Sequence, residues 1–508
     1  MHTLNAAMFL EDAAQRAGDK PFLLTGQQPV TFGQVEEHAR RAARMFTDLG
    51  IQPGERIAFL LGNSPTFMAC YFGALKMGAV PVPLNPQSPG PEVAYYLTDS
   101  HAGAFIAAEP FLEAAQVGFQ TAGTCQHFLL DNLPGSTACP PAAQRLAPLL
   151  SATSSAFTTA VTQPQDVAIV LYTSGTTGRP KGAMLSHANL HFFTELLARD
   201  QWELGPSDVI LMTASASHIF GQTILLVACA STAALSLVGR IDIATLAANI
   251  QRDRVTYFAG VPMLANLLLH SPQVAAFDLS SLRKVMFGGA TISSEVMAQF
   301  KARFQVEVIT GYGMTEAVPL TFANAALMRS APPGSVGKPV WGTSLRIVDE
   351  TDTDMPPGSA GEIIVRGPQV FSGYQNRPEA NAEALRGGWF HTGDAGYLDA
   401  NGYLFIVDRL REMVKVSGFS VFPAEVERVL QAHPAVAEVA VIGLQRKNLD
   451  ERLKAFVVLK PGAEAGAREL IAYCEAQLAE YKCPRLIEFR ASLAKSPTGK
   501  IDKKSLAE

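Results

Sequence analysis

The chain has 508 residues and a formal net charge of −5, and 48% of its residues are hydrophobic while 17% are charged. A chain of this length exceeds what one hydrophobic core serves, so we expect two or more domains. The slight negative charge excludes the strongly basic classes that bind nucleic acid, and we expect no nucleic-acid partner.

The cysteines indicate a reducing environment. All six are scattered without the C-x-x-C spacing of a zinc site or a redox pair. We therefore expect reduced, unpaired thiols and a cytoplasmic protein. They are Cys70, Cys125, Cys139, Cys229, Cys474 and Cys483.

The N-terminal segment has no basic region followed by an apolar core, so no signal peptide is expected. The apolar run from Ile224 to Val238 is shorter than the ~20 residues that span a bilayer, and polar residues such as Ser231 interrupt it. We interpret it as a buried helix that leads into a buried strand. No transmembrane segment is expected, and peripheral contact with a membrane is left open.

Helical spacing of apolar residues predicts helices over residues 7–18 and 33–49. A strand from Arg56, a helix over 64–77 and a strand from Ala79 follow. This alternation predicts an α/β fold with a mostly parallel sheet covered by helices. The strands are nearly continuous apolar runs, as is typical of strands buried on both faces. Such runs recur at 104–107, 127–130, 167–172, 208–212, 234–238 and 256–259.

The sequence changes in character at about Gly334, where short strands alternate with glycine and proline turns. We expect a β-rich subdomain over 334–407, the last part of an N-terminal domain that spans 1–407. A charged junction at 408–412 leads to an α+β module over 413–508. In this module the sequence predicts helices over 423–432 and 467–481 and strands over 437–443 and 454–459.

A loop rich in glycine and hydroxyl groups follows the predicted strand 167–172. Glycines let a ligand approach the backbone closely, and N–H groups, hydroxyls and cations together favour a polyphosphate. A polar linker is the alternative, but a linker needs neither a strand before it nor Arg179 and Lys181 after it. The spacing is not G-x-x-x-x-G-K-[ST], so no Walker-type fold is implied. The loop residues are Thr173, Ser174, Gly175, Thr176, Thr177 and Gly178.

Three further glycine turns carry groups suited to a nucleotide. In the stretch TGYGMTE, Tyr312 can cover a base and Glu316 can hold Mg²⁺, while a helix N-terminus capped by Thr315 is the alternative. Asp394 follows a glycine and can accept hydrogen bonds from a ribose diol, although Asp is also common in ordinary turns. The FGGA turn exposes backbone at a sheet edge, which alone is a weak signal.

Two other residues are ambiguous by their spacing. His218 lies in an apolar stretch next to a glycine, where a histidine is more often a satisfied core residue. No nucleophile pattern of the Ser/His/Asp kind accompanies it. Lys500 lies in a Pro/Gly loop near the end of the sequence, and its spacing alone gives it no role.

Eight stretches, in this order, resemble the motifs of the adenylate-forming superfamily, which includes acyl-CoA synthetases, coumarate ligases, luciferases and adenylation domains of peptide synthetases. The resemblance covers essentially the whole chain, and the last two stretches are most similar to those of fatty acyl-CoA synthetases. The stretches are YTSGTTGRPKG, SHIFG, FGGA, GYGMTE, GEIIVRG, WFHTGD, DRLREMVKVSGFSVFPAEVE and SPTGK.

The resemblance implies a large N-terminal AMP-binding domain, a hinge at 408–412 and a small mobile C-terminal domain. It also implies a two-step reaction that uses ATP, Mg²⁺ and coenzyme A. A carboxylate attacks the α-phosphate of ATP and releases pyrophosphate, which leaves an acyl-AMP. The small domain then rotates, and the thiol of coenzyme A takes the acyl group.

The resemblance also implies roles for individual residues. Lys500 falls on the lysine that bridges the attacking carboxylate and the α-phosphate, and His218 falls on the gate of the acyl pocket. Thr315 falls on the α-phosphate contact, and Glu316 with Thr177 on the Mg²⁺ site. The β- and γ-phosphates are assigned to Thr173, Ser174, Gly175, Thr176, Thr177 and Lys181.

The other implied contacts concern the nucleoside, coenzyme A and the acid. Adenine is assigned to Gly289, Ala290 and Tyr312, and the ribose to Asp394 and Arg409. The hinge is assigned to Arg411, and coenzyme A to Lys415, Ser417 and Gly418. The acyl pocket is assigned to His218, Ile219, Phe220, Val261, Pro262, Gly288, Gly313, Val318 and Pro319.

Several departures from the family pattern concern specificity and leave the catalytic groups intact. Residues 214–217 read Ala-Ser-Ala-Ser where Leu-Pro-Leu-Phe is usual, so the pocket entrance is expected to differ. Thr291 follows FGGA where Pro or Ala is common, and no glycine precedes Glu451. Arg411 stands where Lys or Asp is usual.

We expect a medium- or long-chain fatty acid as the substrate, because the absence of a cation from the pocket positions argues against a dicarboxylate such as malonate. An aryl acid of the cinnamate or benzoate type is the alternative, which pocket length would decide. A ligase that loads a carrier protein and an acyl-AMP ligase that never uses coenzyme A are further alternatives. Intact Lys181, Glu316 and Lys500 argue against a non-catalytic binding protein. A monomer and a homodimer are both left open.

Overall fold

The computed structural model describes residues 4–132, 139–173, 179–239, 241–289, 292–416, 419–446, 449–478, 480–495 and 501–506. The chain forms two compact units. The N-terminal unit consists of Met1–Pro333, Pro339–Thr343 and Arg366–Gly388. The C-terminal unit consists of Gly334–Lys338, Ser344–Val365 and Trp389–Glu508. A hinge at 408–412 stays a prediction, because compactness alone does not report movement.

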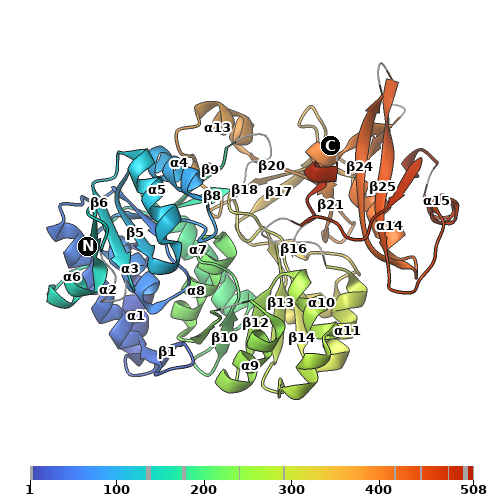
Figure 1. Ribbon diagram of the computed structural model, residues 1–508. Helices are drawn as coiled ribbons and strands as arrows, with labels where there is room; N and C mark the ends of the chain where they lie inside the picture. The colour runs from blue at the N-terminus through green and yellow to red at the C-terminus, as the bar shows by residue number, and fades with distance from the viewer. Residues whose placement is uncertain are drawn as a thin grey trace. The chain divides into compact units, whose positions relative to one another are not determined.

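Two mostly parallel sheets flanked by helices form the N-terminal unit, and the expected α/β class is confirmed (Figure 1). The larger sheet has seven strands in the order β14-β13-β12-β10-β11-β1-β2, parallel except for the β1–β2 pair. Its strands are β1 (Pro21–Leu24), β2 (Val30–Thr31), β10 (Val209–Met212), β11 (Ala234–Leu237), β12 (Tyr257–Gly260), β13 (Lys284–Phe287) and β14 (Glu307–Thr310).

The second sheet of this unit has five parallel strands in the order β4-β3-β5-β6-β7. They are β3 (Arg56–Leu60), β4 (Val80–Pro83), β5 (Ala102–Ala108), β6 (His127–Asp131) and β7 (Ala143–Arg145). The helices are α1 (Met8–Ala17), α2 (Phe32–Asp48), α3 (Pro65–Lys76), α4 (Gly90–Ser100), α5 (Leu112–Ala122), α6 (Leu146–Ala152), α7 (His187–Leu196), α8 (Ile219–Ser231), α9 (Ile243–Asp253), α10 (Pro262–His270), α11 (Ser294–Phe304), α12 (Ala325–Ser330) and α13 (Pro378–Ala384).

Local signals explain where several of these elements begin. Helix α2 begins after Thr31, whose side chain accepts from the N–H of Gln34 in a reciprocal capping box. Helix α3 begins after Ser64, which caps it, and Pro65 occupies the first helical position. The predicted helices 7–18 and 33–49 are confirmed as α1 and α2.

The apolar run 224–238 forms the end of α8 and the buried strand β11, as expected. Among the described residues, no helix combines the length and the apolar character that a membrane crossing requires. The six cysteines are unpaired, also as expected.

The glycine-rich loop joins two antiparallel strands, β8 (Val167–Thr173) and β9 (Lys181–Ser186). Thr173 lies opposite Lys181 at the end of this hairpin. A short strand from much later in the chain, β19 (Gly373–Tyr374), pairs with the other side of β9. The loop therefore emerges from a three-stranded sheet, and not from the strand-to-helix junction of a Walker loop.

The C-terminal unit contains a four-stranded sheet, antiparallel in its β18–β20 and β20–β21 pairs, and an α+β module. The sheet has the order β17-β18-β20-β21, with strands Ser344–Val348, Gly361–Arg366, Phe390–Leu398 and Leu404–Arg409. The module contains β22 (Val414–Val416), β23 (Phe419–Val421), α14 (Pro423–Gln431), β24 (Val436–Arg446), β25 (Leu449–Leu459), α15 (Ala467–Glu475) and β26 (Leu486–Phe489).

Three elements of this module have ends that differ from the sequence expectation. Helix α15 ends at Glu475, not at 481, and a short 3-10 turn over Glu480–Lys482 follows. Strands β24 and β25 extend beyond their apolar parts, with Leu444 opposite Arg452. Ladder hydrogen bonds need only backbone groups, so pairing continues where the apolar pattern stops.

Candidate active site

Four neighbouring parallel strands end at one edge of the seven-stranded sheet, and predicted site residues follow each of them. The register places Gly260, Phe287 and Thr310 side by side at the ends of β12, β13 and β14. Ligands bind at the carboxyl ends of such strands in α/β sheets. In the order β10, β12, β13 and β14, the loops at this edge contain residues 213–218, 261–262, 288–289 and 311–313.

Glycines leave room at this edge where side chains would fill it. A Cβ at Gly288 would lie 3.1 Å from the end of the Met286 side chain and 4.0 Å from the ring of Phe220, and a Cβ at Gly313 would lie 3.0 Å from Val318. Gly289 has a φ of +77°, a conformation that favours glycine. The other predicted acyl-pocket residues are Ile219 at the start of α8, Val261 and Pro262 at the start of α10, and Pro319.

His218 occupies the N-cap position of α8, where its carbonyl accepts from the N–H of Gln222. Its own N–H donates to the carbonyl of Ser215 at 3.0 Å. The residue is exposed, yet desolvation by the surrounding protein lowers the pKa of its imidazole. The ring is therefore neutral at neutral pH, which suits a gate in an apolar pocket.

Asn63 holds the turn that precedes His218, a contact that the sequence did not reveal. Its side chain donates to the carbonyl of Ala214 at 2.9 Å and accepts from the N–H of Ala216 at 3.0 Å. The two bonds fix the backbone of the segment that departs from the family pattern.

Thr315 and Glu316 form the tip of a tight turn. Met314 and Ala317 exchange two backbone hydrogen bonds of 3.0 Å across them. The alternative of a helix N-terminus capped by Thr315 is wrong, because this turn leads back into extended chain and the strand Thr321–Phe322. The N–H of Phe371 donates to the carbonyl of Glu316 at 2.9 Å and holds the turn in place.

Tyr374 joins the metal-binding candidate Glu316 to the phosphate-binding candidate Lys181. Its hydroxyl donates to Oε1 of Glu316 at 2.7 Å. The Nζ atom of Lys181 lies 5.0 Å from the centre of its ring. Sequence spacing gave no signal for Tyr374, because strand β19 reaches β9 only through the fold.

The donor set at this turn fits Mg²⁺. Mg²⁺ prefers one or two carboxylates together with phosphate oxygens and water, and Glu316 presents a carboxylate at a turn tip. The ammonium group of Lys181 lies over the ring of Tyr374, whose hydroxyl binds Glu316, and it can neutralise phosphate charge. The predicted second metal contact, Thr177, lies outside the described residues.

In the C-terminal unit, Asp394 and Arg409 are paired across β20 and β21, as neighbouring ribose contacts would require. Nε of Arg409 lies 3.6 Å from Oδ1 of Asp394. The N–H of Asp394 donates to Oγ1 of Thr392 at 3.1 Å, and Thr392 donates to the carbonyl of Ile363 at 2.7 Å. The turn that carries Asp394 is therefore fastened to the neighbouring strand.

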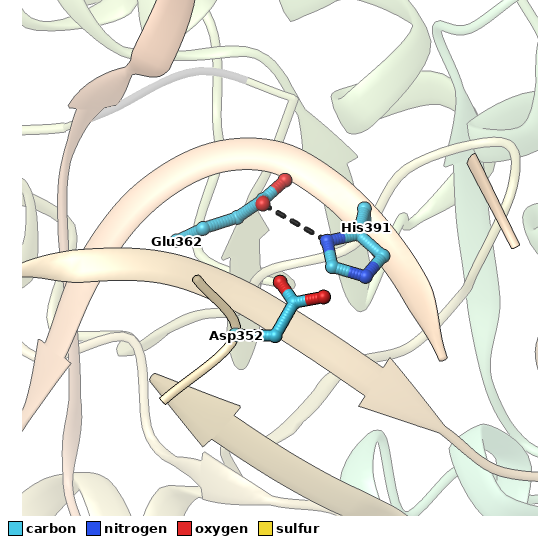
Figure 2. Close-up of side chains that lie close together, drawn as sticks. All are labelled: Asp352, Glu362 and His391. Atoms are coloured by element: carbon cyan, nitrogen blue, oxygen red, sulfur yellow. Dashed lines mark hydrogen bonds and ion pairs between the residues drawn. The ribbon is translucent and has the colours of Figure 1, made fainter. Parts of the chain in front are cut away.

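Asp352, Glu362 and His391 gather beside this turn, with one ligand atom of each within 4.8 Å of the others. Figure 2 shows both carboxylates turned towards the ring of His391. One oxygen of Glu362 accepts from Nδ1 of His391 at 2.9 Å, and the other accepts from the N–H of Gly393 at 3.2 Å. Because both oxygens of Glu362 bind the WFHTGD turn, we interpret the cluster as a support for Asp394 and not as a metal site.

The other predicted site residues stay predictions. Tyr312 lies in the loop after β14, where its N–H donates to Oγ1 of Thr321 at 3.0 Å. Arg411 and Lys415 lie in described backbone, but their side chains do not belong to the described part. Outside the described residues lie Ser174, Gly175, Thr176, Thr177, Ala290, Ser417, Gly418 and Lys500.

Comparison with known proteins matches almost the whole chain. The family described as AMP-binding enzyme matches residues 10–375, and the AMP-binding enzyme C-terminal domain matches residues 425–500. A long-chain-fatty-acid–CoA ligase of Bacillus subtilis (strain 168) is 32% identical, with 98% of this chain and 93% of the relative covered. A feruloyl-CoA synthase of Amycolatopsis sp is 33% identical, with 94% of this chain and 93% of the relative covered.

Among solved structures, the anthranilate CoA ligase AuaEII in complex with anthranoyl-AMP superposes with a TM-score of 0.91 at 29% identity. The comparison covers 99% of this chain and 96% of that chain. Relatives with aliphatic and with aromatic acids in their names thus occur together.

Proposed function

The chain belongs to the AMP-binding enzyme family and is an AMP-forming acid–CoA ligase that uses ATP, and from this premise we propose that its acid is a medium- or long-chain fatty acid. The observation that carries this choice is the character of the pocket positions. Apart from the gate His218, they are aliphatic, aromatic, proline or glycine residues, and none is cationic. An apolar chain gains free energy from burial against such residues, at roughly 25 cal/mol per Å².

In the first step, an oxygen of the acid carboxylate attacks the α-phosphorus of ATP, and the bond to pyrophosphate breaks. Lys181 and the loop 173–178 hold the β- and γ-phosphates that leave, and Lys500 bridges the carboxylate and the α-phosphate. Glu316 and Thr177 would hold Mg²⁺, which would neutralise charge at the phosphates. This step is positioning with electrostatic stabilisation.

In the second step, the thiolate of coenzyme A attacks the acyl carbonyl and AMP leaves. Asp394 and Arg409 hold the ribose of AMP, and the family pattern assigns Gly418 to the approach of the pantetheine arm. Movement of the residues after the hinge at 408–412 removes Lys500 from the site after the first step and brings Gly418 there for the second. His218 stays neutral and closes the acyl pocket towards the phosphates.

An aryl acid is the second candidate, and a specific observation favours it. The feruloyl-CoA synthase is as similar in sequence to this chain as the fatty-acid relative is, at 33% and 32% identity, and the anthranilate CoA ligase superposes with a TM-score of 0.91. The Ala-Ser-Ala-Ser segment before His218 replaces large apolar residues by small ones. Smaller side chains at the proposed pocket entrance would leave room for a bulky ring as well as for a chain.

The test is ATP-dependent CoA ligation over a panel of saturated acids from four to eighteen carbons and of benzoate- and cinnamate-type acids. Release of pyrophosphate and formation of the thioester are measured together. We expect kcat/KM to rise with chain length to an optimum at medium or long chains. A maximum on an aryl acid would overturn the fatty-acid assignment, and pyrophosphate release without thioester would indicate an acyl-AMP ligase or a carrier-protein acceptor.

A further inference from the structure

Tyr374 lies between two side chains that the proposed function uses. We propose that Tyr374 is a positioning residue, which holds the carboxylate of Glu316 and the ammonium group of Lys181 in one arrangement and thereby sets the affinity for ATP with Mg²⁺. This inference rests on the proposed roles of Glu316 and Lys181.

The geometry of the three-stranded sheet brings Tyr374 to Lys181. Tyr374 lies opposite Ala183 on β9, and residues two apart on a strand project from the same face. Tyr374 and Lys181 are therefore diagonal neighbours on one face of the sheet. The distance of 5.0 Å from Nζ to the ring centre lies within the ~6 Å range of a cation–π interaction.

The hydroxyl of Tyr374 orients Glu316. A phenol is protonated at neutral pH, so it donates to the carboxylate, and the bond of 2.7 Å is short. This bond takes one of about four acceptor positions of the carboxylate. Hydrogen bonds to carboxylates that bind metals fix their orientation, and their removal costs about ten- to a hundredfold in metal affinity.

The backbone of Tyr374 is held by two hydrogen bonds that do not involve its own side chain. The side-chain amide of Asn381 accepts from the N–H of Tyr374 at 2.6 Å and donates to its carbonyl at 2.9 Å. The ring of Phe371 packs edge-on against that of Tyr374, with centres 4.8 Å apart. Because the Asn381 clamp acts on the backbone, substitutions of the Tyr374 side chain leave the strand in place.

The same sheet offers a matched control. Tyr172 on β8 donates its hydroxyl to a carboxylate, Oδ2 of Asp99, at 2.9 Å. It resembles Tyr374 in chemistry and burial, but its partner is not a predicted metal or phosphate contact. Tyr172→Phe removes a tyrosine–carboxylate hydrogen bond from the same sheet without touching Glu316.

The experiment measures the dissociation constant of ATP by calorimetry, without acid, in the presence and in the absence of Mg²⁺. The ratio of the two constants reports how much Mg²⁺ adds to binding. A parallel titration with Mn²⁺, followed by its electron paramagnetic resonance signal, reads the metal directly. The variants are Tyr374→Phe, Tyr374→Leu and Tyr172→Phe.

For Tyr374→Phe we expect the Mg²⁺-dependent ratio to fall about tenfold while metal-free ATP binding is unchanged, because the ring below Lys181 remains. For Tyr374→Leu we expect the same loss and, in addition, a roughly twofold to fivefold weaker metal-free affinity, because the cation–π contact is gone. Tyr172→Phe is expected to match the wild type in both.

A wild-type ratio in Tyr374→Phe would overturn the positioning role. An equal fall in Tyr374→Phe and Tyr172→Phe would also overturn it, because the loss would then come from the sheet in general. A wild type that binds no ATP would instead overturn the proposed function, and this inference with it.

Discussion

Asn63 follows strand β3 of the five-stranded sheet and binds the segment before His218, at the proposed entrance of the acyl pocket. Its two hydrogen bonds hold Ala214 and Ala216, and the amide of Gln222 also donates to the carbonyl of Ala216. His218 begins directly after this fixed turn, so its direction depends on Asn63.

Asn63→Ala is expected to raise the KM for the acid roughly tenfold while leaving the KM for ATP within about twofold. Two hydrogen bonds of about 0.5–1.5 kcal/mol each are lost, and their loss frees the turn before the gate. Steady-state kinetics with each substrate varied in turn measures the split. Asn401→Ala, on an exposed turn, is the control. An equal rise in the KM for ATP would show that Asn63 supports the stability of the whole protein and has no specific role at the acyl pocket.

At this scale the sequence predicted residues that belong to a local pattern and missed those that act across the fold. Glu316 and Lys181 lie in recognisable glycine-rich stretches, and His218 stands beside a glycine in an apolar run. Asn63 and Tyr374 carry no such pattern, because their partners are 151 and 58 residues away along the chain. Only the strand order brings them together.

Among the elements, the first turn of α8 shows how tightly the pocket entrance is built. A Cβ at Gly221 would lie 2.1 Å from the carbonyl oxygen of Ser215 and 2.8 Å from the N–H nitrogen of Ala216. Both contacts are to backbone, which Asn63 holds from the other side. The glycine is therefore required by a close approach of helix and turn.

Gly221→Ala is expected to destabilise the protein by about 1–3 kcal/mol and to weaken acid binding, since the helix must move away from the turn. Thermal unfolding and the KM for the acid measure the two effects. Gly205→Ala is the matched control, because a Cβ there meets nothing within 4 Å. Equal unfolding midpoints for the two variants would contradict this prediction, because they would show that the turn accommodates the added Cβ at no cost in stability.

Element types were predicted better than element ends and turns. Most apolar runs correspond to strands of the two large sheets, because burial on both faces leaves a continuous signal. The run 167–172 was wrongly expected there, since it pairs antiparallel with β9 in the three-stranded sheet, and β1, β2, β7 and β14 were not among the predicted runs. The alternative that Thr315 caps a helix was wrong. It was considered because a Thr near a Glu is also typical of a helix N-terminus. The turn is shaped by two backbone hydrogen bonds between Met314 and Ala317, and the residue types at these positions do not predict such bonds. The pairing of β19 with β9 was likewise invisible.

At the level of the whole molecule, His187 links the N-terminal segment to the helix that follows the phosphate hairpin. The side chain is buried, and its Nδ1 accepts from the N–H of Ala6 at 3.0 Å. Burial, and next the neighbouring His191, lower the pKa of His187 to about 4. The neutral form is thus required for the contact.

Because the pKa of His187 is lower in the folded state than its ordinary value of about 6.5, its contribution to stability is complete above pH 6.5 and is lost as the pH falls towards 4. From pH 7.5 to 5.0 this loss amounts to about 2 kcal/mol. His187→Asn keeps an acceptor and removes the titration, so its urea midpoint should fall less over this interval than that of the wild type. Parallel falls would exclude His187 as a source of acid sensitivity.

Strand order is the part of the whole fold that the sequence could not give. Strand β1 joins the seven-stranded sheet beside β11, more than two hundred residues later, and no local pattern encodes that neighbour. The sequence predicts a β-rich subdomain over 334–407, and the residues of this stretch are divided between the two compact units. Lys500, proposed for the first step, and Gly418, proposed for the second, lie outside the described part, and their roles rest on the family pattern.

That pattern predicts opposite effects for these two residues, because each serves one half of the reaction. Lys500→Ala should lower acyl-AMP formation about a hundred- to a thousandfold, since it removes a charge that stabilises the attack. Thioester formation from supplied acyl-AMP should be largely intact. Gly418→Phe should do the reverse, because a bulky ring blocks the path of the thiol. Pyrophosphate release and thioester formation from supplied acyl-AMP, measured separately, test both variants.

Equal losses in both steps for Lys500→Ala would contradict its role in the first step. An unchanged second step for Gly418→Phe would show that this residue does not lie on the path of the thiol.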